Sequence, residues 1–223
     1  MVEHACSYRV VDSLVSHFMT IDLGAIYRAS RLRVAELVDD SVADRPVPAT
    51  PAWNAHDVVA HLAGVMNDIL SDNMEGAATP PWTAAQVERG HGKSVGQVVD
   101  EWAEVAPGFE TFLSSPDGAK AGVAVMDVHA HETDLRSAFG LAPELSDDVL
   151  TWAAGALRDG FDSQVEAAGL PAVKIEVPEF EMFRGRLGRR TREQVVAFGW
   201  SADPTPYLDT FFLFGPTEHA VGL

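Results

Sequence analysis

Three side chains with the chemistry of metal ligands fall on two predicted helices. Asp127 and His131 are four residues apart on a helix predicted over 119–139, so their side chains lie one above the other on one helix face. His131 lies in the middle of the apolar stripe of that helix, and His61 lies at the edge of the apolar stripe of an earlier helix. Two imidazoles and a carboxylate suit zinc or a similar divalent ion, and three protein ligands leave positions open, as in catalytic sites. The sequence therefore predicts a divalent metal site at His61, Asp127 and His131.

The same spacing has a second interpretation. An inward histidine is often an ordinary core residue with its hydrogen bonds satisfied, and an Asp–His pair on one helix can be a buried ion pair. Asp127 is also a short ligand for a metal held by His131. Both interpretations stay open at this stage.

The elements that must position these side chains are helices, because apolar residues recur at helical spacing in most of the chain. Asn54 and Ser146 are predicted N-caps, and Asp57 adds a carboxylate in the first turn of its helix. On a helical wheel, His129 points outward, away from the apolar stripe of its helix. The predicted helices are 20–43, 55–72, 94–114, 119–139 and 147–168.

Prolines and glycines separate these helices. Three prolines within 45–51 end the first helix and favour an extended linker. The segment 73–92 contains two prolines and three glycines, so it is predicted to be a long surface loop. Pro107 falls inside the third helix, where a kink or break is expected.

The composition changes near residue 170. Residues 172–177 alternate as a β-strand does, and the segment 184–192 holds five arginines among nine residues, which is predicted to be a basic helix start. We therefore expect a mainly α protein, with a helical bundle carrying the metal site over 1–169 and a small α/β segment over 170–223. The arginines fit a solvated helix face, and some of them are candidates for binding an acidic ligand.

Composition and charge exclude several classes of protein. The 223 residues have a formal net charge of -17, so nucleic acid and anionic membranes are not expected partners. No apolar run approaches the roughly 20 residues that span a bilayer, and the first residues do not resemble a secretory signal. The single cysteine, Cys6, rules out an internal disulfide. We expect a cytoplasmic protein, either a monomer or a homodimer.

Three ordered motifs resemble those of one family. The segment 53–64 fits the pattern W-x-x-x-D-V-V-x-H-L, which opens a helix in the DinB-like, mycothiol-dependent maleylpyruvate isomerase family. His131 begins a segment that is similar to that family's H-x-x-D-L motif, with Gly140 beyond it. The segment 188–195, followed by Trp200, resembles the family's C-terminal region. Together the motifs cover most of the chain in the expected order.

The resemblance implies a DinB-like four-helix bundle with a small α/β appendage. It implies a zinc-type ion held by His61, His131 and the acid four residues before the latter, which is Asp127 here and typically Glu in the family. Asp134 matches the aspartate of the second motif and is expected to orient a ligand or contact the substrate. Arg189 lies in the Gly-Arg of the family-like tail and is a candidate for binding the substrate or thiol cofactor.

The function that the resemblance implies is isomerisation or S-transfer on a small electrophilic substrate. Mycothiol or a related low-molecular-weight thiol loses its proton on the metal ion and becomes the nucleophile, so no protein cysteine is needed. Two alternatives use the same ligands. One is a non-catalytic protein that binds metal or a small ligand, and the other is a hydrolase in which metal-bound water is the nucleophile.

Overall fold

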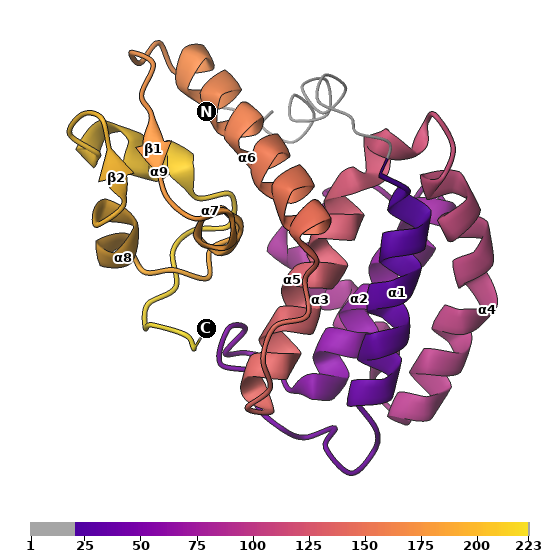
Figure 1. The fold of residues 1–223 in the computed structure, drawn as a ribbon. Coiled ribbons are helices and arrows are strands. Elements are labelled where there is room, and N and C mark those ends of the chain that lie inside the picture. Colours follow the sequence, from indigo (N-terminus) through magenta and orange to yellow (C-terminus); the bar gives the residue numbers. More distant parts are fainter. Residues whose placement is uncertain (1–20, 223) are drawn as a thin grey trace. The chain divides into compact units, whose positions relative to one another are not determined.

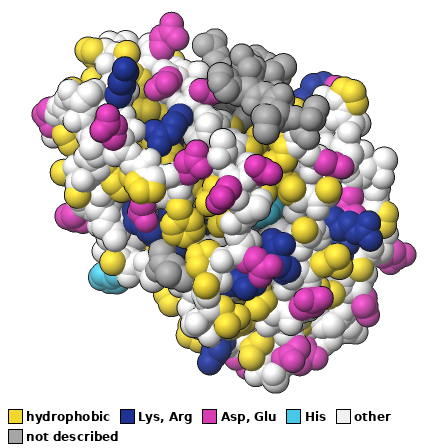
Figure 2. Space-filling model, viewed as in Figure 1, with side chains coloured by type: hydrophobic (Ala, Val, Ile, Leu, Met, Phe, Trp, Pro, Cys, Tyr) yellow, Lys and Arg dark blue, Asp and Glu magenta, His cyan; other side chains and the backbone are white. Residues whose placement is uncertain are grey.

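The computed structural model describes residues 21–222, which are mainly helical and contain one two-stranded sheet (Figure 1). These residues form two compact units that divide after Glu144. Cys6 lies outside the described residues. Within the described part, no helix is long and apolar enough to cross a membrane. Figure 2 shows Asp and Glu side chains scattered over the face in view, as expected for an acidic surface without a charged tail.

The first unit is built from five α-helices and one short 3-10 helix. Helix α1 packs on α4 and α5, and α2 packs on the same two helices, so these four helices close a ring. Helix α3 packs along α2. The elements are α1 (Leu23–Leu37), α2 (Ala55–Leu70), α3 (Pro80–Gly90), α4 (Val95–Leu113), η2 (Gly118–Ala121) and α5 (Gly122–Ala138).

Local capping explains where α2 begins. The Asn54 side chain accepts a hydrogen bond from the Asp57 backbone at 2.9 Å, and the Asp57 carboxylate accepts one from the Asn54 backbone at 3.2 Å. This reciprocal pair satisfies two backbone donors at the helix start, and it confirms the predicted N-cap at Asn54. The cap fixes the phase of α2 and therefore the direction in which His61, two turns later, points.

Helix α1 ends at Leu37, before the predicted end at residue 43. The Asp39 side chain accepts a hydrogen bond from the backbone N–H of Ser41 at 2.8 Å. A local bond of this kind competes with the helical hydrogen bonds, so the chain turns here.

The prediction of a surface loop over 73–92 is wrong for residues 80–90, which form α3. Pro80 and Pro81 lie in the first turn of α3. Backbone N–H groups in a first turn have no partner within the helix, so a proline there loses no hydrogen bond, and its φ angle suits the helix. The preceding segment is fastened to the helix, since the Trp82 indole donates to the Asn73 carbonyl at 2.9 Å. Helix α3 buries Gln86 and Val87 against its neighbours.

The expected break at Pro107 is also absent, because α4 runs through it without interruption. Pro107 is exposed, so water can reach the carbonyl that the proline ring leaves without a helical partner. Apolar residues on the other side of α4, such as Trp102 and Phe109, are fully buried and hold the helix in place.

The second unit includes the helix predicted over 147–168, which begins at the expected cap Ser146. The sequence had assigned this helix to the bundle, whereas the structure groups it with the C-terminal elements. Arg158 of this helix donates to the carbonyls of Ile175 and Val177 at 2.8 and 2.9 Å, which fastens the sheet to it. The elements are α6 (Asp147–Ala167), β1 (Ile175–Glu176), α7 (Glu179–Arg186), α8 (Arg192–Val196), β2 (Gly199–Trp200), η3 (Thr205–Tyr207) and α9 (Leu208–Phe211).

The strand expected over 172–177 is shortened to β1, which pairs antiparallel with β2. The arginine-rich segment does not begin a single helix: its first arginines end α7, and its last begins α8. Arg186 is buried between the rings of Phe161 and Phe211 and donates to the Gln164 side chain at 2.9 Å. Its role in this unit is therefore packing, and not display on a solvated face.

Candidate metal centre

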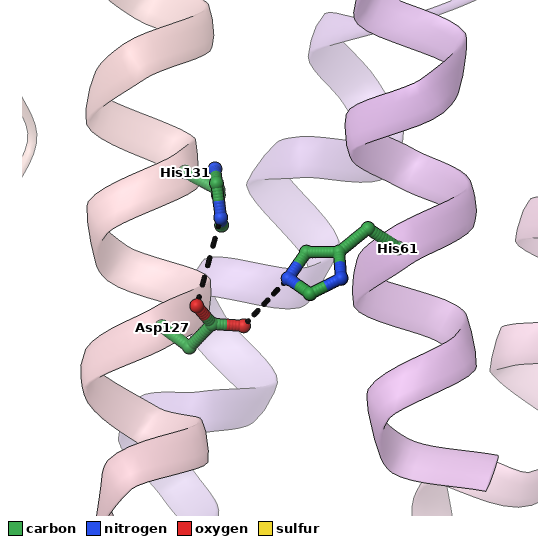
Figure 3. A group of neighbouring side chains, drawn as sticks. All are labelled: His61, Asp127 and His131. Atoms are coloured by element: carbon green, nitrogen blue, oxygen red, sulfur yellow. Dashed lines mark ion pairs between the residues drawn. The ribbon is translucent and has the colours of Figure 1, made fainter. Parts of the chain in front are cut away.

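His61, Asp127 and His131 come together in the first unit, as predicted (Figure 3). His61 projects from α2, and the other two project from α5, which packs on α2. The Nε2 atom of His61 lies 3.3 Å from Oδ2 of Asp127, and Nε2 of His131 lies 3.6 Å from Oδ1 of the same carboxylate. The three ligand atoms all lie within 4.8 Å of one another.

Both imidazoles are held from behind by a hydrogen-bond acceptor. Nδ1 of His61 lies 2.7 Å from Oε1 of Gln86, and Nδ1 of His131 lies 3.3 Å from Oδ2 of Asp134. An acceptor at Nδ1 favours a proton on that atom, and a neutral ring then carries a lone pair at Nε2. Both lone pairs consequently face the Asp127 carboxylate.

This arrangement brings three electron-rich atoms together. Two imidazole lone pairs and a carboxylate repel one another unless a cation lies between them. That cation is either a proton, which would make one ring an imidazolium paired with Asp127, or a metal ion. Two nitrogen ligands and one oxygen ligand form the donor set of many catalytic zinc sites, so the residues present fit a divalent ion of that kind.

The cluster is mostly shielded from water. The side chains of His61 and His131 are 7% and 5% exposed, and that of Asp127 is 25% exposed, but the Oδ2 atom of Asp127 that faces His61 is buried. The Trp53 ring lies beside both imidazoles, with centroid distances of 5.0 Å to His61 and 5.8 Å to His131. An aromatic wall of this kind lowers the local dielectric constant and strengthens the electrostatic interactions of the cluster.

The other two predicted site residues lie in different places. Asp134 is buried on α5 and contacts the Nδ1 side of His131, which fits the expected role of orienting a ligand. Arg189 belongs to the second unit, where its Nη1 donates to the Leu187 carbonyl at 2.6 Å. Binding of substrate or cofactor by Arg189 stays a prediction.

His129 was predicted to point outward, and this is wrong. It is 3% exposed, and its Nδ1 lies 2.8 Å from the Val125 carbonyl of the same helix. Helix α5 is buried around most of its circumference between residues 124 and 135, so a two-sided helical wheel does not describe it. Burial lowers the pKa of His129, which favours a neutral ring.

Sequence reasoning missed Gln86 because the segment that contains it was predicted to be a loop. Asp68, which accepts a hydrogen bond from Gln86, and Arg89, which donates to Asp68, were also missed. Trp53 was noted as part of a motif, but not as a wall of the site. The Pro-Pro pair after Thr79 was the available signal for α3, since prolines are common in the first turn of a helix.

A surface depression of about 410 Å³ lies at the start of α2, and none of the three cluster residues lines it. His56 and His91 line it, and both lie near the Asp57 carboxylate, with Nδ1 of His56 at 3.9 Å and Nε2 of His91 at 3.6 Å. These two histidines therefore surround a helix-capping aspartate.

Comparison with protein-family models, curated proteins and solved structures finds no significant match. Function is therefore inferred from the site itself and from the sequence motifs.

Proposed function

We propose that this chain is a metal-dependent enzyme that uses mycothiol or a related thiol, as an isomerase or S-transferase, on a small electrophilic substrate. The observation that carries the proposal is the convergence of His61, Asp127 and His131, with both imidazoles held at Nδ1 by an acceptor. The motifs shared with the DinB-like, maleylpyruvate isomerase-like family support the choice of thiol chemistry, and the ring of four helices supports a DinB-like bundle.

The three residues would hold a divalent ion, with zinc best matched to the donor set. When bound, such an ion acts as a Lewis acid and lowers the pKa of a coordinated thiol or water. Asp127 contributes one negative charge and the neutral histidines none, so the ligand set leaves a divalent ion with net positive charge. That charge would favour binding of an anionic thiolate or of the carboxylate of a substrate.

The surrounding residues do three things. Gln86 and Asp134 keep the two imidazoles in a fixed orientation. Trp53 lies against the rings and limits access of water, and the Asp127 side chain is the most exposed of the three. In this proposal the thiol nucleophile is a separate molecule and not the single cysteine of the chain, Cys6, which lies outside the described residues. A reducing cytoplasm keeps such a thiol available.

The test is an assay for loss of free thiol, with mycothiol and a panel of small electrophiles, in the presence of zinc and after chelation. The proposal expects thiol loss or substrate isomerisation that requires both metal and His61. Hydrolysis of substrate without thiol would favour the hydrolase instead, and metal binding without any turnover would favour a binding protein. Thiol consumption that is unchanged by chelation or by His61→Ala would overturn the proposal.

A further inference from the structure

Behind His61 a chain of polar side chains crosses from α2 to α3. Oε1 of Gln86 lies 2.7 Å from Nδ1 of His61, and Nε2 of Gln86 donates to Oδ2 of Asp68 at 2.8 Å. Arg89 donates to the same carboxylate oxygen at 2.8 Å, and Asn73 donates to the other oxygen at 2.8 Å. Gln86 is 0% exposed and Asp68 is 4% exposed, so water does not compete for these bonds.

The direction of each hydrogen bond in the chain follows from the chemistry of its members. An aspartate that receives bonds from an arginine, an amide and a second amide is an acceptor at both oxygens. The Gln86 amide must therefore turn its NH2 group to Asp68, which leaves its carbonyl oxygen for His61. A carbonyl oxygen only accepts, so Nδ1 of His61 must donate.

We propose that Gln86, held by Asp68 and Arg89, is a positioning residue that fixes His61 with its proton on Nδ1 and its Nε2 lone pair toward Asp127. The proposal rests on the proposed function for its purpose, since a lone pair at Nε2 is what a metal ligand requires. The hydrogen bonds that link Asp68, Gln86 and His61 do not depend on any metal.

Glycine at position 64 makes this contact possible. Gly64 lies one turn after His61 on α2, and a Cβ atom placed there would lie 2.6 Å from Cβ and 2.7 Å from Cγ of Gln86. Gly90 on α3 likewise lets α2 approach, since a Cβ atom at Gly90 would collide with the Ala60 side chain of α2. The two helices approach closely because each presents a glycine to the other, and Gln86 lies within the contact.

The two histidines are positioned by different chemistry. His131 faces the carboxylate of Asp134, whereas His61 faces the neutral amide of Gln86. The nearest negative charge on that side of His61 is on Asp68, which accepts a hydrogen bond from Gln86. A carboxylate partner increases the basicity of an imidazole ligand more than an amide does. Gln86 therefore orients His61 without bringing a second full charge next to the ligand cluster.

The test measures zinc affinity by competition with a chromophoric chelator in the full chain. Gln86→Leu keeps the volume of the side chain but removes the acceptor, and we expect about 10- to 100-fold weaker zinc binding. The matched control is Val87→Ala, which truncates a neighbouring buried residue of α3, and we expect it to leave the affinity unchanged. Equal affinity in Gln86→Leu and the parent, or an equal loss in Val87→Ala, would overturn the proposal.

A rescue variant separates positioning from packing. In the double variant Gln86→Glu with Asp68→Asn, the amide at position 68 donates to the carboxylate at position 86, and that carboxylate accepts from Nδ1 of His61. Arg89 loses the acceptor oxygen that it has in the parent, so the expected recovery is partial. We expect this variant to bind zinc more tightly than Gln86→Leu. No recovery over Gln86→Leu would contradict the positioning role.

A second readout is independent of metal. In metal-free protein, ¹⁵N chemical shifts of the His61 ring should show the Nδ1–H form, and this preference should be lost in Gln86→Leu. If Nδ1 of His61 carries no proton in the parent, the proposal is wrong. If the chain binds no zinc at all but the Nδ1–H form is found, the proposed function fails while the positioning by Gln86 stands.

Discussion

Glu132, the residue after His131, is the basis for our main prediction on stability. Its carboxylate is 1% exposed and accepts hydrogen bonds from Ser30 at 2.6 Å and from Arg33 at 2.6 and 2.7 Å. Ser30 and Arg33 belong to α1, so this network fastens α1 to α5 and fixes the rotation of the helix that carries two of the three candidate ligands.

We expect Glu132→Ala to destabilise the first unit by about 3 kcal/mol. Removing one partner of a buried ion pair costs roughly 3 to 5 kcal/mol, because the remaining charge is buried without compensation. The lower end applies here, since the Arg33 side chain is 24% exposed and also lies 3.7 Å from the Glu144 carboxylate. Glu132→Gln keeps the shape and one acceptor oxygen, so we expect a smaller loss of about 1 to 2 kcal/mol.

The assay is urea unfolding followed by far-UV circular dichroism, with a chelator present so that metal binding does not contribute. With a denaturant slope of about 2 kcal/mol/M, a loss of 3 kcal/mol moves the midpoint down by about 1.5 M. The control is Lys120→Ala, which breaks an exposed ion pair with Asp117 and should change stability by no more than about 0.5 kcal/mol. A midpoint for Glu132→Ala that matches the control would refute this account of how α1 and α5 are held together.

Three further predictions concern other parts of the chain. Gly24→Ala should destabilise the protein by about 2 kcal/mol in urea unfolding, because the added Cβ would collide with the backbone of α4. In Gly108→Ala the added Cβ meets no atom within 4 Å, so this variant should stabilise α4 by about 0.5 to 1 kcal/mol. Equal effects of the two variants would contradict the close packing of Gly24 on α4. The two hydrogen bonds from Arg190 hold the pKa of Glu181 below its ordinary value. The stabilisation from this pair is therefore present above about pH 4.5 and is lost as the pH falls through the lowered pKa. Glu181→Gln should flatten the curve of unfolding free energy against pH in this range, and an unchanged curve would count against the pair. Copper(II) at the cluster should quench Trp53 fluorescence, so Trp53→Phe should remove most of the quenching, and full quenching in that variant would place the ion elsewhere.

The sequence was sufficient to predict that the three candidate ligand residues meet. The spacing of Asp127 and His131 on one helix and the inward position of His61 on another depend only on helical periodicity, which is a strong local signal. The helix starts at Asn54 and Ser146 were predictable for the same reason, because a cap is a contact over three residues.

The parts that could not be predicted depend on tertiary packing. The helix that contains Gln86 is not evident from local sequence, because Pro80 and Pro81 favour a loop when tertiary contacts are unknown. The hydrogen-bonded side chains behind His61 are hidden with it. His129 was misplaced because the wheel assumes one buried face, whereas α5 is enclosed on most sides. The grouping of α6 with the C-terminal elements depends on contacts with residues far away in the sequence, such as those of Arg158 with the strand carbonyls.

The most direct test of the account is the zinc content of the purified chain, measured by elemental analysis after dialysis against zinc. The account predicts about one zinc ion per chain, near-complete loss in His61→Ala and in His131→Ala, and retention in Asp127→Glu, which keeps the carboxylate ligand. His56→Ala is the control, since it removes a histidine of α2 that lies outside the cluster, and it should bind as much zinc as the parent. If His61→Ala and His131→Ala bind as much zinc as the parent, the cluster is not a metal centre and the proposed function is wrong.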